Sequence, residues 1–203
     1  MRKLLSKGNA KLSPLIGAWS ITAGMEVCGR ICKGCFAMKE QKRWATVRTG
    51  RDYRYQISQE DTFINQMNTE IAKSKFTMIR VHASGEFYSQ DYVNKWVRIA
   101  KANTEKVFYA YTKRMDEFDF SEIKALPNFV LHNSFIEIGT KNRRKVENFG
   151  NDIFIKRAKI ETGGFVCPMA KNTQMCGVPK EQGGCDWCQR KENEGTAILF
   201  KQH

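Results

Sequence analysis

Three closely spaced cysteines are the residues whose type and spacing most clearly indicate chemistry. Cys28, Cys32 and Cys35 form the pattern C-x3-C-x2-C. Three thiolates on one short loop can hold three irons of a cubane [4Fe–4S] cluster, which leaves the fourth iron open to another ligand. The nearby Arg30 and Lys33 would offset the negative charge of such a cluster. The alternatives are a zinc site completed by a distant residue, or cysteines buried as small apolar side chains.

A second group of cysteines lies near the other end of the chain. Cys167, Cys176, Cys185 and Cys188 have the pattern C-x8-C-x8-C-x2-C. Four thiolates fit either a closed tetrahedral zinc site or a fully ligated second [4Fe–4S] cluster, and the sequence does not separate the two. The total of seven cysteines is odd, and the first residues do not resemble a secretory leader. We therefore expect a cytoplasmic protein with metal-binding cysteines rather than a disulfide framework.

The composition is that of a folded, strongly basic protein. The 203 residues carry 34 Lys and Arg against 21 Asp and Glu, a formal net charge of +13. Such a charge attracts polyanions, so nucleic acid is a candidate partner, although many basic proteins are simply soluble. No stretch of the chain is apolar over the length that a membrane span needs, and we expect no membrane contact. The composition says nothing about the oligomeric state.

Hydrophobic patterning predicts an alternation of strands and helices, which is typical of a parallel α/β sheet. Strands are predicted at 12–22, 76–83, 106–112 and 129–136, more weakly at 152–156, and at 196–200, where a last strand would close the sheet. Helices are predicted at 36–44, 58–74, 89–103 and 120–126, with Ser58 and Ser89 as N-caps of the second and third. We expect residues 1–160 to form an α/β domain, a partial (β/α) barrel with parallel strands. Residues 161–203 would form a small Cys-rich lobe.

Ligands of parallel sheets bind at the carboxyl ends of the strands. The early cysteine loop follows the first predicted strand, and Ser84-Gly85-Glu86 follows the second. Both should therefore face the same mouth. Arg80 and His82 are alternate residues of the second strand, so we expect them on one face, either lining the cavity or forming a hydrogen-bonded core pair.

The C-x3-C-x2-C loop after a first strand resembles the radical-SAM superfamily. That resemblance implies S-adenosylmethionine on the open iron, an external reductant, and reductive cleavage to a 5′-deoxyadenosyl radical. It also implies that Ser84-Gly85-Glu86 stands for the motif that contacts the methionine amino group, with Glu86 as the contacting residue. The alternative for Glu86 is a solvated carboxylate near a helix N-terminus.

A sharper resemblance covers most of the chain. Cys-Phe-Ala-Met-Lys at 35–39, Ile-Arg-Val-His-Ala-Ser-Gly-Glu-Phe-Tyr-Ser at 79–89, Trp96, and Cys-Pro at 167–168 resemble the bacteriophage gene product 88 family. The resemblance implies a viral protein that acts in an infected bacterial host. Its substrate stays open. The alternative to an enzyme is a non-catalytic iron–sulfur protein of the same fold that binds nucleic acid or a protein partner, and a zinc-only binding module is a third possibility.

Overall fold

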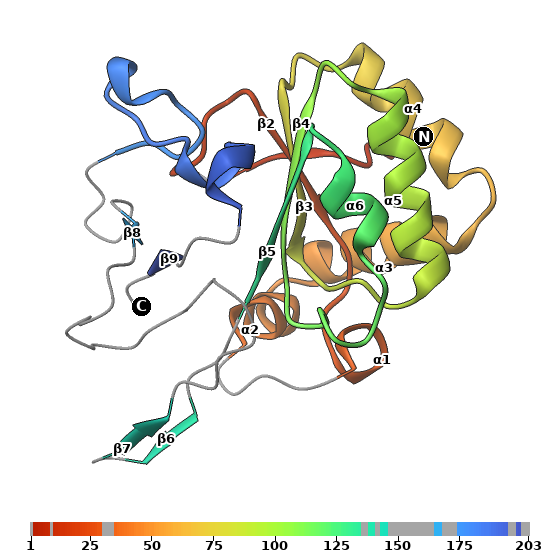
Figure 1. The fold of residues 1–203 in the computed structure, drawn as a ribbon. Helices are drawn as coiled ribbons and strands as arrows, with labels where there is room; N and C mark the ends of the chain where they lie inside the picture. Colours follow the sequence, from red (N-terminus) through yellow and green to blue (C-terminus); the bar gives the residue numbers. More distant parts are fainter. Residues whose placement is uncertain are drawn as a thin grey trace.

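A five-stranded, mostly parallel sheet forms the centre of the molecule (Figure 1). The computed structural model describes residues 2–8, 10–29, 35–134, 138–140, 143–145, 165–167, 174–194 and 198–199. The strand order is β1-β2-β3-β4-β5, in which β1 is antiparallel to β2 and the other neighbours are parallel. These strands are β1 (Ser6–Lys7), β2 (Ile16–Ser20), β3 (Met78–Ser84), β4 (Val107–Thr112) and β5 (Phe129–Asn133).

Helices connect the parallel strands, as the alternating pattern predicts. They are α1 (Met25–Cys28), α2 (Phe36–Arg43), α3 (Ala45–Gln59), α4 (Phe63–Lys73), α5 (Gln90–Ala102) and α6 (Ser121–Ala125). The helices predicted at 36–44, 89–103 and 120–126 are confirmed. Ser89 caps α5, where its hydroxyl accepts a hydrogen bond from the Tyr92 backbone N–H. In the described part of the chain, no helix has the length and apolar character needed to cross a membrane.

The region between α2 and α4 differs from the prediction. Residues 45–59 form the helix α3, and Ser58 lies buried inside it, so Ser58 is not the N-cap of the next helix. Thr62 holds that position before α4. The helix α3 was not predicted because it contains Gly50 and its buried residues are Arg51 and Ser58, which are polar, so the sequence shows no clear apolar stripe.

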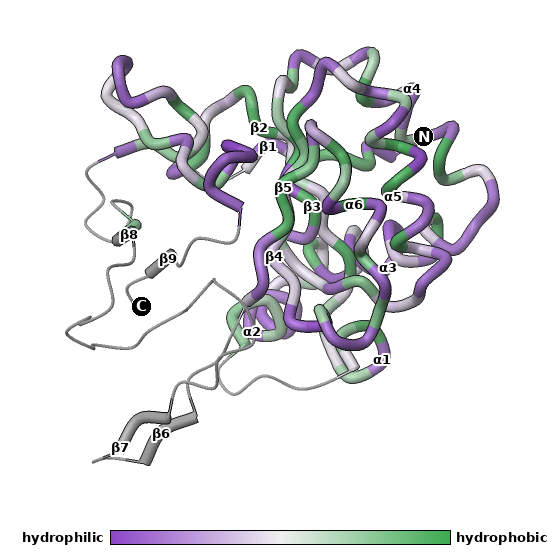
Figure 2. The backbone as a smooth tube through the Cα atoms, in the orientation of Figure 1, coloured by the Kyte–Doolittle hydropathy of each residue, from purple (hydrophilic) through white to green (hydrophobic). Residues whose placement is uncertain are grey.

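Both faces of the sheet are covered, one by helices and the other by the segment 174–194. Alternate side chains of each strand pack under α4, α5 and α6 in the main core, which is built around Trp19, Trp96 and Phe108. The opposite face carries a smaller cluster of Ile16, Tyr109 and Val130. The segment 174–194, blue in Figure 1, lies on that side. Figure 2 shows the consequence, since hydrophobic residues follow the central strands while hydrophilic residues follow the outer turns of the helices.

The barrel and its closing strand are not reproduced by the described residues. Among them, β1 and β5 each pair with a single neighbour, so the sheet is open at both edges. The predicted strand at 196–200 exists as β9 (Ile198–Leu199), but it pairs with β8 (Phe165–Val166) in a separate sheet and does not close the main one. A further two-stranded sheet joins β6 (Ile138–Thr140) to β7 (Arg143–Lys145). The strand predicted at 152–156 lies outside the described residues, and the domain division stays a prediction.

Strand β3 contains an irregularity that separates Arg80 from His82. The register against β2 shifts between Ala18 and Ser20, and His82 has a φ of 61°, in the left-handed region. Because this turn of the backbone interrupts the alternation of side chains, His82 packs into the main core. Arg80 points to the other face, with its guanidinium carbon 5.8 Å from the ring centre of Tyr111. The expectation that the two residues share a face is therefore wrong.

His82 is a core histidine with one strong partner. Its Nε2 lies 3.0 Å from the hydroxyl oxygen of Tyr92, which also accepts a hydrogen bond from Trp19 Nε1 at 2.7 Å. The ring meets Phe87 edge-on, with 4.5 Å between the ring centres. Burial lowers the pKa of His82 from 6.5 to about 3, because a charged imidazolium would have to lose its water.

Because His82 is buried in its neutral form, we expect the folded protein to lose stability in acid. The folded state favours the neutral imidazole, so the stabilisation is complete above the unfolded pKa of 6.5 and is lost as the pH falls toward 3. We expect the free energy of unfolding to fall by up to about 1.4 kcal/mol per pH unit in this window from His82 alone. Urea unfolding of the wild type and of His82→Asn, measured between pH 7 and about 4, tests the prediction.

Asparagine tolerates a positive φ and does not titrate here, so His82→Asn should remove this part of the slope. Tyr92→Phe is the matched control, because it removes the hydroxyl partner but keeps the buried histidine. A pH slope that is the same in the wild type and in His82→Asn would contradict the assignment.

Candidate metal centre

The carboxyl ends of the parallel strands are joined to one another by hydrogen bonds. The Ile21 N–H donates to the Ser84 carbonyl at 3.0 Å, and the Ser84 hydroxyl donates to the Ile21 carbonyl at 3.0 Å. Gly85 follows with a φ of 86°, and a Cβ there would collide with the side chain of Ile21. The turn after β3 therefore lies directly against the chain that leaves β2 toward the early cysteines. That the cysteine loop itself faces this turn stays a prediction, because residues 30–34 lie outside the described part of the chain.

The early cysteine loop begins and ends at this edge. Cys28 is the last residue of α1, and Cys35 directly precedes the first residue of α2. Cys32 lies outside the described residues, so the convergence of the three thiols remains a prediction. The structure describes how the two ends of the loop are held.

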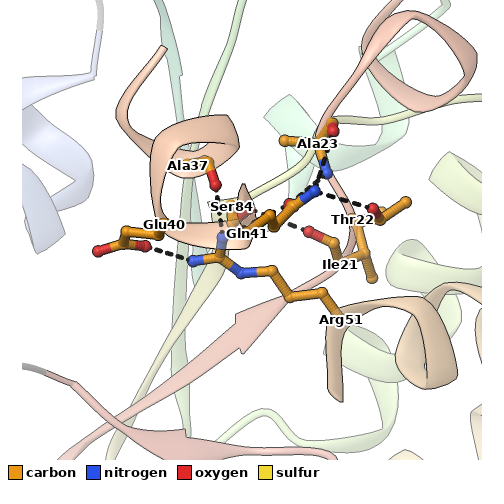
Figure 3. A network of polar contacts seen from close by, with 8 residues as sticks. All are labelled: Ile21, Thr22, Ala23, Ala37, Glu40, Gln41, Arg51 and Ser84. Carbon is orange, nitrogen blue, oxygen red and sulfur yellow. Dashed lines mark hydrogen bonds and ion pairs between the residues drawn. The ribbon is translucent and has the colours of Figure 1, made fainter. Parts of the chain in front are cut away.

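Two polar side chains hold the ends of this loop together (Figure 3). Gln41 of α2 reaches back across the loop, where its Oε1 accepts from the Ala23 N–H at 2.7 Å and its Nε2 donates to the Ala23 carbonyl at 3.2 Å. Arg51 of α3 then supports α2, because its guanidinium donates to the Ala37 carbonyl at 2.9 Å and to Glu40 Oε2 at 2.7 Å. The span that the cysteine loop must bridge is therefore fixed by α2 and α3.

Arg114 approaches the same loop from the turn after β4. Its Nη1 donates to the carbonyls of Val27 at 3.2 Å and Phe87 at 3.1 Å, and its Nε donates to Glu117 Oε2 at 2.8 Å. Gly29 has a φ of 66°, and a Cβ there would lie 3.1 Å from the Arg114 guanidinium carbon. A fixed cation thus lies against the backbone beside Cys28, where a thiolate-ligated group would carry negative charge.

Glu86 is buried, and its carboxylate bonds to protein donors. Oε1 accepts from the Thr112 hydroxyl at 2.8 Å and from the Phe87 N–H at 3.0 Å, while Oε2 accepts from the Lys113 N–H at 2.9 Å. Burial raises the pKa of Glu86, and the three hydrogen bonds oppose that rise. The expected alternative of a solvated carboxylate is therefore wrong, because Glu86 is only 6% exposed. It joins the ends of β3 and β4.

The late cysteines gather on the opposite face of the sheet. Cys176 and Cys185 pair through their backbones in an isolated β-bridge. Cys167 packs with Cys188 against Tyr111. Burial raises the pKa of the Cys176 and Cys188 thiols, and the neighbouring late cysteines raise it further. The sequence prediction that these four residues belong together is supported by these contacts. Within the described ranges, however, no three Cys, His, Asp or Glu side chains are arranged as a finished metal site.

The residues that position the early loop were missed by reasoning from the sequence. Gln41, Arg51 and Arg114 resemble ordinary helix and turn residues in the sequence. The Arg114 side chain is only 12% exposed. Only its position could have pointed to Arg114, because residue 114 follows the carboxyl end of a predicted strand, where parallel sheets bind ligands.

Removing the Arg114 guanidinium should loosen the end of the cysteine loop. Arg114→Met leaves two part-buried carbonyls without their donor, which costs about 1–3 kcal/mol. We expect the backbone amides of Cys28 and Gly29, which bond to Gly24 and Met25, to exchange with solvent at least about tenfold faster. Hydrogen exchange followed by mass spectrometry measures this.

Arg48→Met is the matched control, because Arg48 is 71% exposed and its only ion pair in the described chain is with Asp52 at 3.7 Å. Surface pairs of this kind contribute about 0–1 kcal/mol, so exchange at residues 28–29 should be unchanged. Equal exchange in the wild type and Arg114→Met would mean that the loop is held by other contacts.

Comparison with known proteins gives one result. No curated protein and no solved structure is similar enough to this chain to count as a match. A family model described as Gene product 88 matches residues 3–193, which is most of the chain. This result agrees with the motifs at 35–39 and 79–89, and it does not support the resemblance to the radical-SAM superfamily. The chain therefore belongs to the gene product 88 family.

Proposed function

We propose that this protein is an iron–sulfur protein in which Cys28, Cys32 and Cys35 hold a [4Fe–4S] cluster with one iron left open. The observation that carries the proposal is the position of the loop. Cys28 and Cys35 lie at its two ends, at the carboxyl edge of a parallel sheet, where α/β proteins bind their ligands. The spacing of the three thiols fits three corners of a cubane better than a zinc site.

The charges around the loop support an anionic group. The Arg114 guanidinium lies against Gly29, and the loop itself contains Arg30 and Lys33. A cubane bound by three thiolates carries net negative charge, which nearby cations stabilise. When bound, such a cluster supplies one-electron chemistry and a coordination position for an outside ligand.

We further propose S-adenosylmethionine as that ligand, with Glu86 near its amino group. Within the described part of the chain, Glu86 Oε2 accepts one hydrogen bond, from the Lys113 N–H, and a carboxylate oxygen has room for a second donor. Because burial raises the pKa of Glu86, a cationic amino group would be a favourable neighbour for its charged form. Ser84 and Gly85 would position this turn rather than bind the ligand themselves. The side chains of Arg80 and His82 point away from the turn, so they take no part in the proposal.

Electron paramagnetic resonance tests the proposal directly. After anaerobic reconstitution with iron and sulfide and then reduction, the wild type should give a cluster signal that shifts when S-adenosylmethionine is added. Replacing Cys28, Cys32 and Cys35 together by alanine should remove that signal, because the remaining cysteines lie over one face of the sheet and not at its carboxyl edge. Replacement of Cys176 and Cys185 is the control and should leave the shifting signal in place.

A signal that ignores S-adenosylmethionine would favour the non-catalytic alternative. An early triple variant that keeps its full iron content and its signal would contradict the cluster assignment. Zinc as the only metal in the reconstituted wild type would favour a binding module instead.

Nucleic acid is a second candidate partner, favoured by the surface around α2. Trp44 is 52% exposed, and the Arg43 guanidinium carbon lies 5.0 Å from its ring centre. Lys39, Lys42 and Arg48 lie in the same two helices. Exposed aromatic rings flanked by cations bind single-stranded nucleic acid by stacking and by charge.

Binding of a single-stranded oligonucleotide, measured at several salt concentrations, tests this surface. We expect affinity to fall steeply with salt and Trp44→Ala to lower it by about 1–3 kcal/mol, the loss of one stacked base. Leu15→Ala is the control. Leu15 is 46% exposed and precedes β2, so it lies at the amino ends of the parallel strands, opposite to the carboxyl edge. Affinity that does not depend on salt would remove nucleic acid as a partner.

A further inference from the structure

An assembly of buried and half-buried sulfur, aromatic and cationic groups lies on the sheet face away from α4, α5 and α6. The sheet contributes Arg80, Tyr109, Tyr111 and His132, and the segment 174–194 contributes three of the four late cysteines. Tyr111 stacks on His132 with 5.1 Å between ring centres. This assembly is separate from the early loop, which lies at the carboxyl edge.

Backbone contacts bring the late cysteines together. The Gly177 N–H donates to the Cys185 carbonyl at 2.7 Å, and the Cys185 N–H donates to the Met175 carbonyl at 2.9 Å. These bonds fix Cys176 beside Cys185. Cys188 lies in the next turn, and it packs with Cys167 as one apolar cluster. Four residues from two separate stretches of sequence therefore meet over one area of the sheet.

We propose that Cys167, Cys176, Cys185 and Cys188 bind one metal centre as four thiolates, and that Arg80 of β3 is its charge partner. The four cysteines form a candidate ligand set from the sequence alone, but the position over the sheet and the role of Arg80 come from the structure. The ligand chemistry is that of a thiolate-binding metal, either a zinc ion or a cubane cluster.

Arg80 lies close enough to the late cysteines to act as a charge partner, and one of its hydrogen-bond donors is unused within the described residues. Its Nε is buried and has no hydrogen-bond partner within the described residues. The guanidinium lies over Tyr111, the same ring against which Cys167 and Cys188 pack. Four thiolates around a divalent ion or a cubane leave a net negative charge, which the half-buried Arg80 guanidinium would partly neutralise.

The surroundings favour a metal over bare thiols. The amide Nε2 of Gln189 donates to the Cys176 sulfur at 3.5 Å, and a sulfur acceptor is strongest as a thiolate. Cys176 is partly buried, and a bound metal cation would stabilise its thiolate there. Since the described sulfurs are not yet arranged as a finished site, we expect metal binding to draw the four of them closer.

A metal here would fasten the Cys-rich segment to the sheet. Among the described residues, that segment has a small apolar cluster of its own, backbone hydrogen bonds that join Cys176 to Lys11 and Ser13, and hydrogen bonds to β5. His132 Nε2 lies 2.9 Å from the Cys188 carbonyl, and Glu194 Oε1 accepts from the Leu131 N–H at 2.8 Å. The metal would thus provide much of the local stability.

Metal analysis of anaerobically purified protein is the first test. We expect the Cys176→Ser/Cys185→Ser variant to lose either about one zinc ion or a cubane's iron per chain relative to the wild type. The early triple variant, Cys28→Ala/Cys32→Ala/Cys35→Ala, should keep that same metal. An unchanged metal content in the late variant would overturn the site, whatever the early variant shows.

Thiol labelling of the wild type keeps the proposal testable if the late variant fails to fold. Iodoacetamide, followed by peptide mass spectrometry, should modify Cys176 and Cys185 slowly in the native protein and at least about tenfold faster after a chelator removes the metal. Re-adding zinc or, for a cluster, iron and sulfide should restore protection. Equal labelling before and after chelation would overturn the proposal.

The role of Arg80 has its own readout. Arg80→Met keeps the unbranched apolar stem of the side chain but removes its charge, and we expect about 10- to 100-fold faster release of the late metal to a chelator. Arg80→Lys should recover part of the retention because it restores the charge. Arg98→Met is the matched control, an exposed arginine on α5 at the other side of the sheet. Equal release from Arg80→Met and Arg98→Met would overturn the assignment of Arg80.

Discussion

The buried carboxylate of Glu86 joins the parts of the molecule that the candidate site needs. It accepts hydrogen bonds from the turn after β4 and from its own turn after β3, so these two strand ends cannot separate without leaving a carboxylate unpaired in the interior. The turn that Glu86 holds is also the one from which Arg114 reaches the early cysteine loop. A change at this carboxylate should therefore reach the loop through Arg114, without any contact to the cysteines.

The two faces and the carboxyl edge of the sheet carry different groups of residues. One face is a dry aromatic core, in which Trp19, Trp96 and Phe63 make edge-on and tilted contacts. The carboxyl edge carries the early loop, with its ends fixed by Gln41 and Arg51. The remaining face holds the late cysteines. Because the early cysteines lie at the carboxyl edge and the late cysteines lie over one face, a metal proposed for one group can be tested without the other.

The left-handed backbone at His82 explains how one strand supplies both sides. If β3 alternated regularly, Arg80 and His82 would share a face, and His82 would lie among the late cysteines beside His132. The turn instead places the imidazole in the aromatic core and leaves Arg80 as the single cation of β3 facing the sulfurs. A strained residue of this kind is retained where the surrounding packing fixes it.

The sequence by itself determined the parallel α/β class, most strands and helices, and the two cysteine groups, because apolar periodicity and ligand spacing are local properties of the chain. It also indicated the gene product 88 family through motifs such as that at 79–89. Only the tertiary structure decided the face on which His82 lies, the existence of α3, the burial of Glu86, and the contacts of Arg114 and Arg80. These depend on backbone irregularity and on partners far away in the sequence, for example the 87 positions that separate Arg114 from Val27. No local pattern of residue types encodes such contacts.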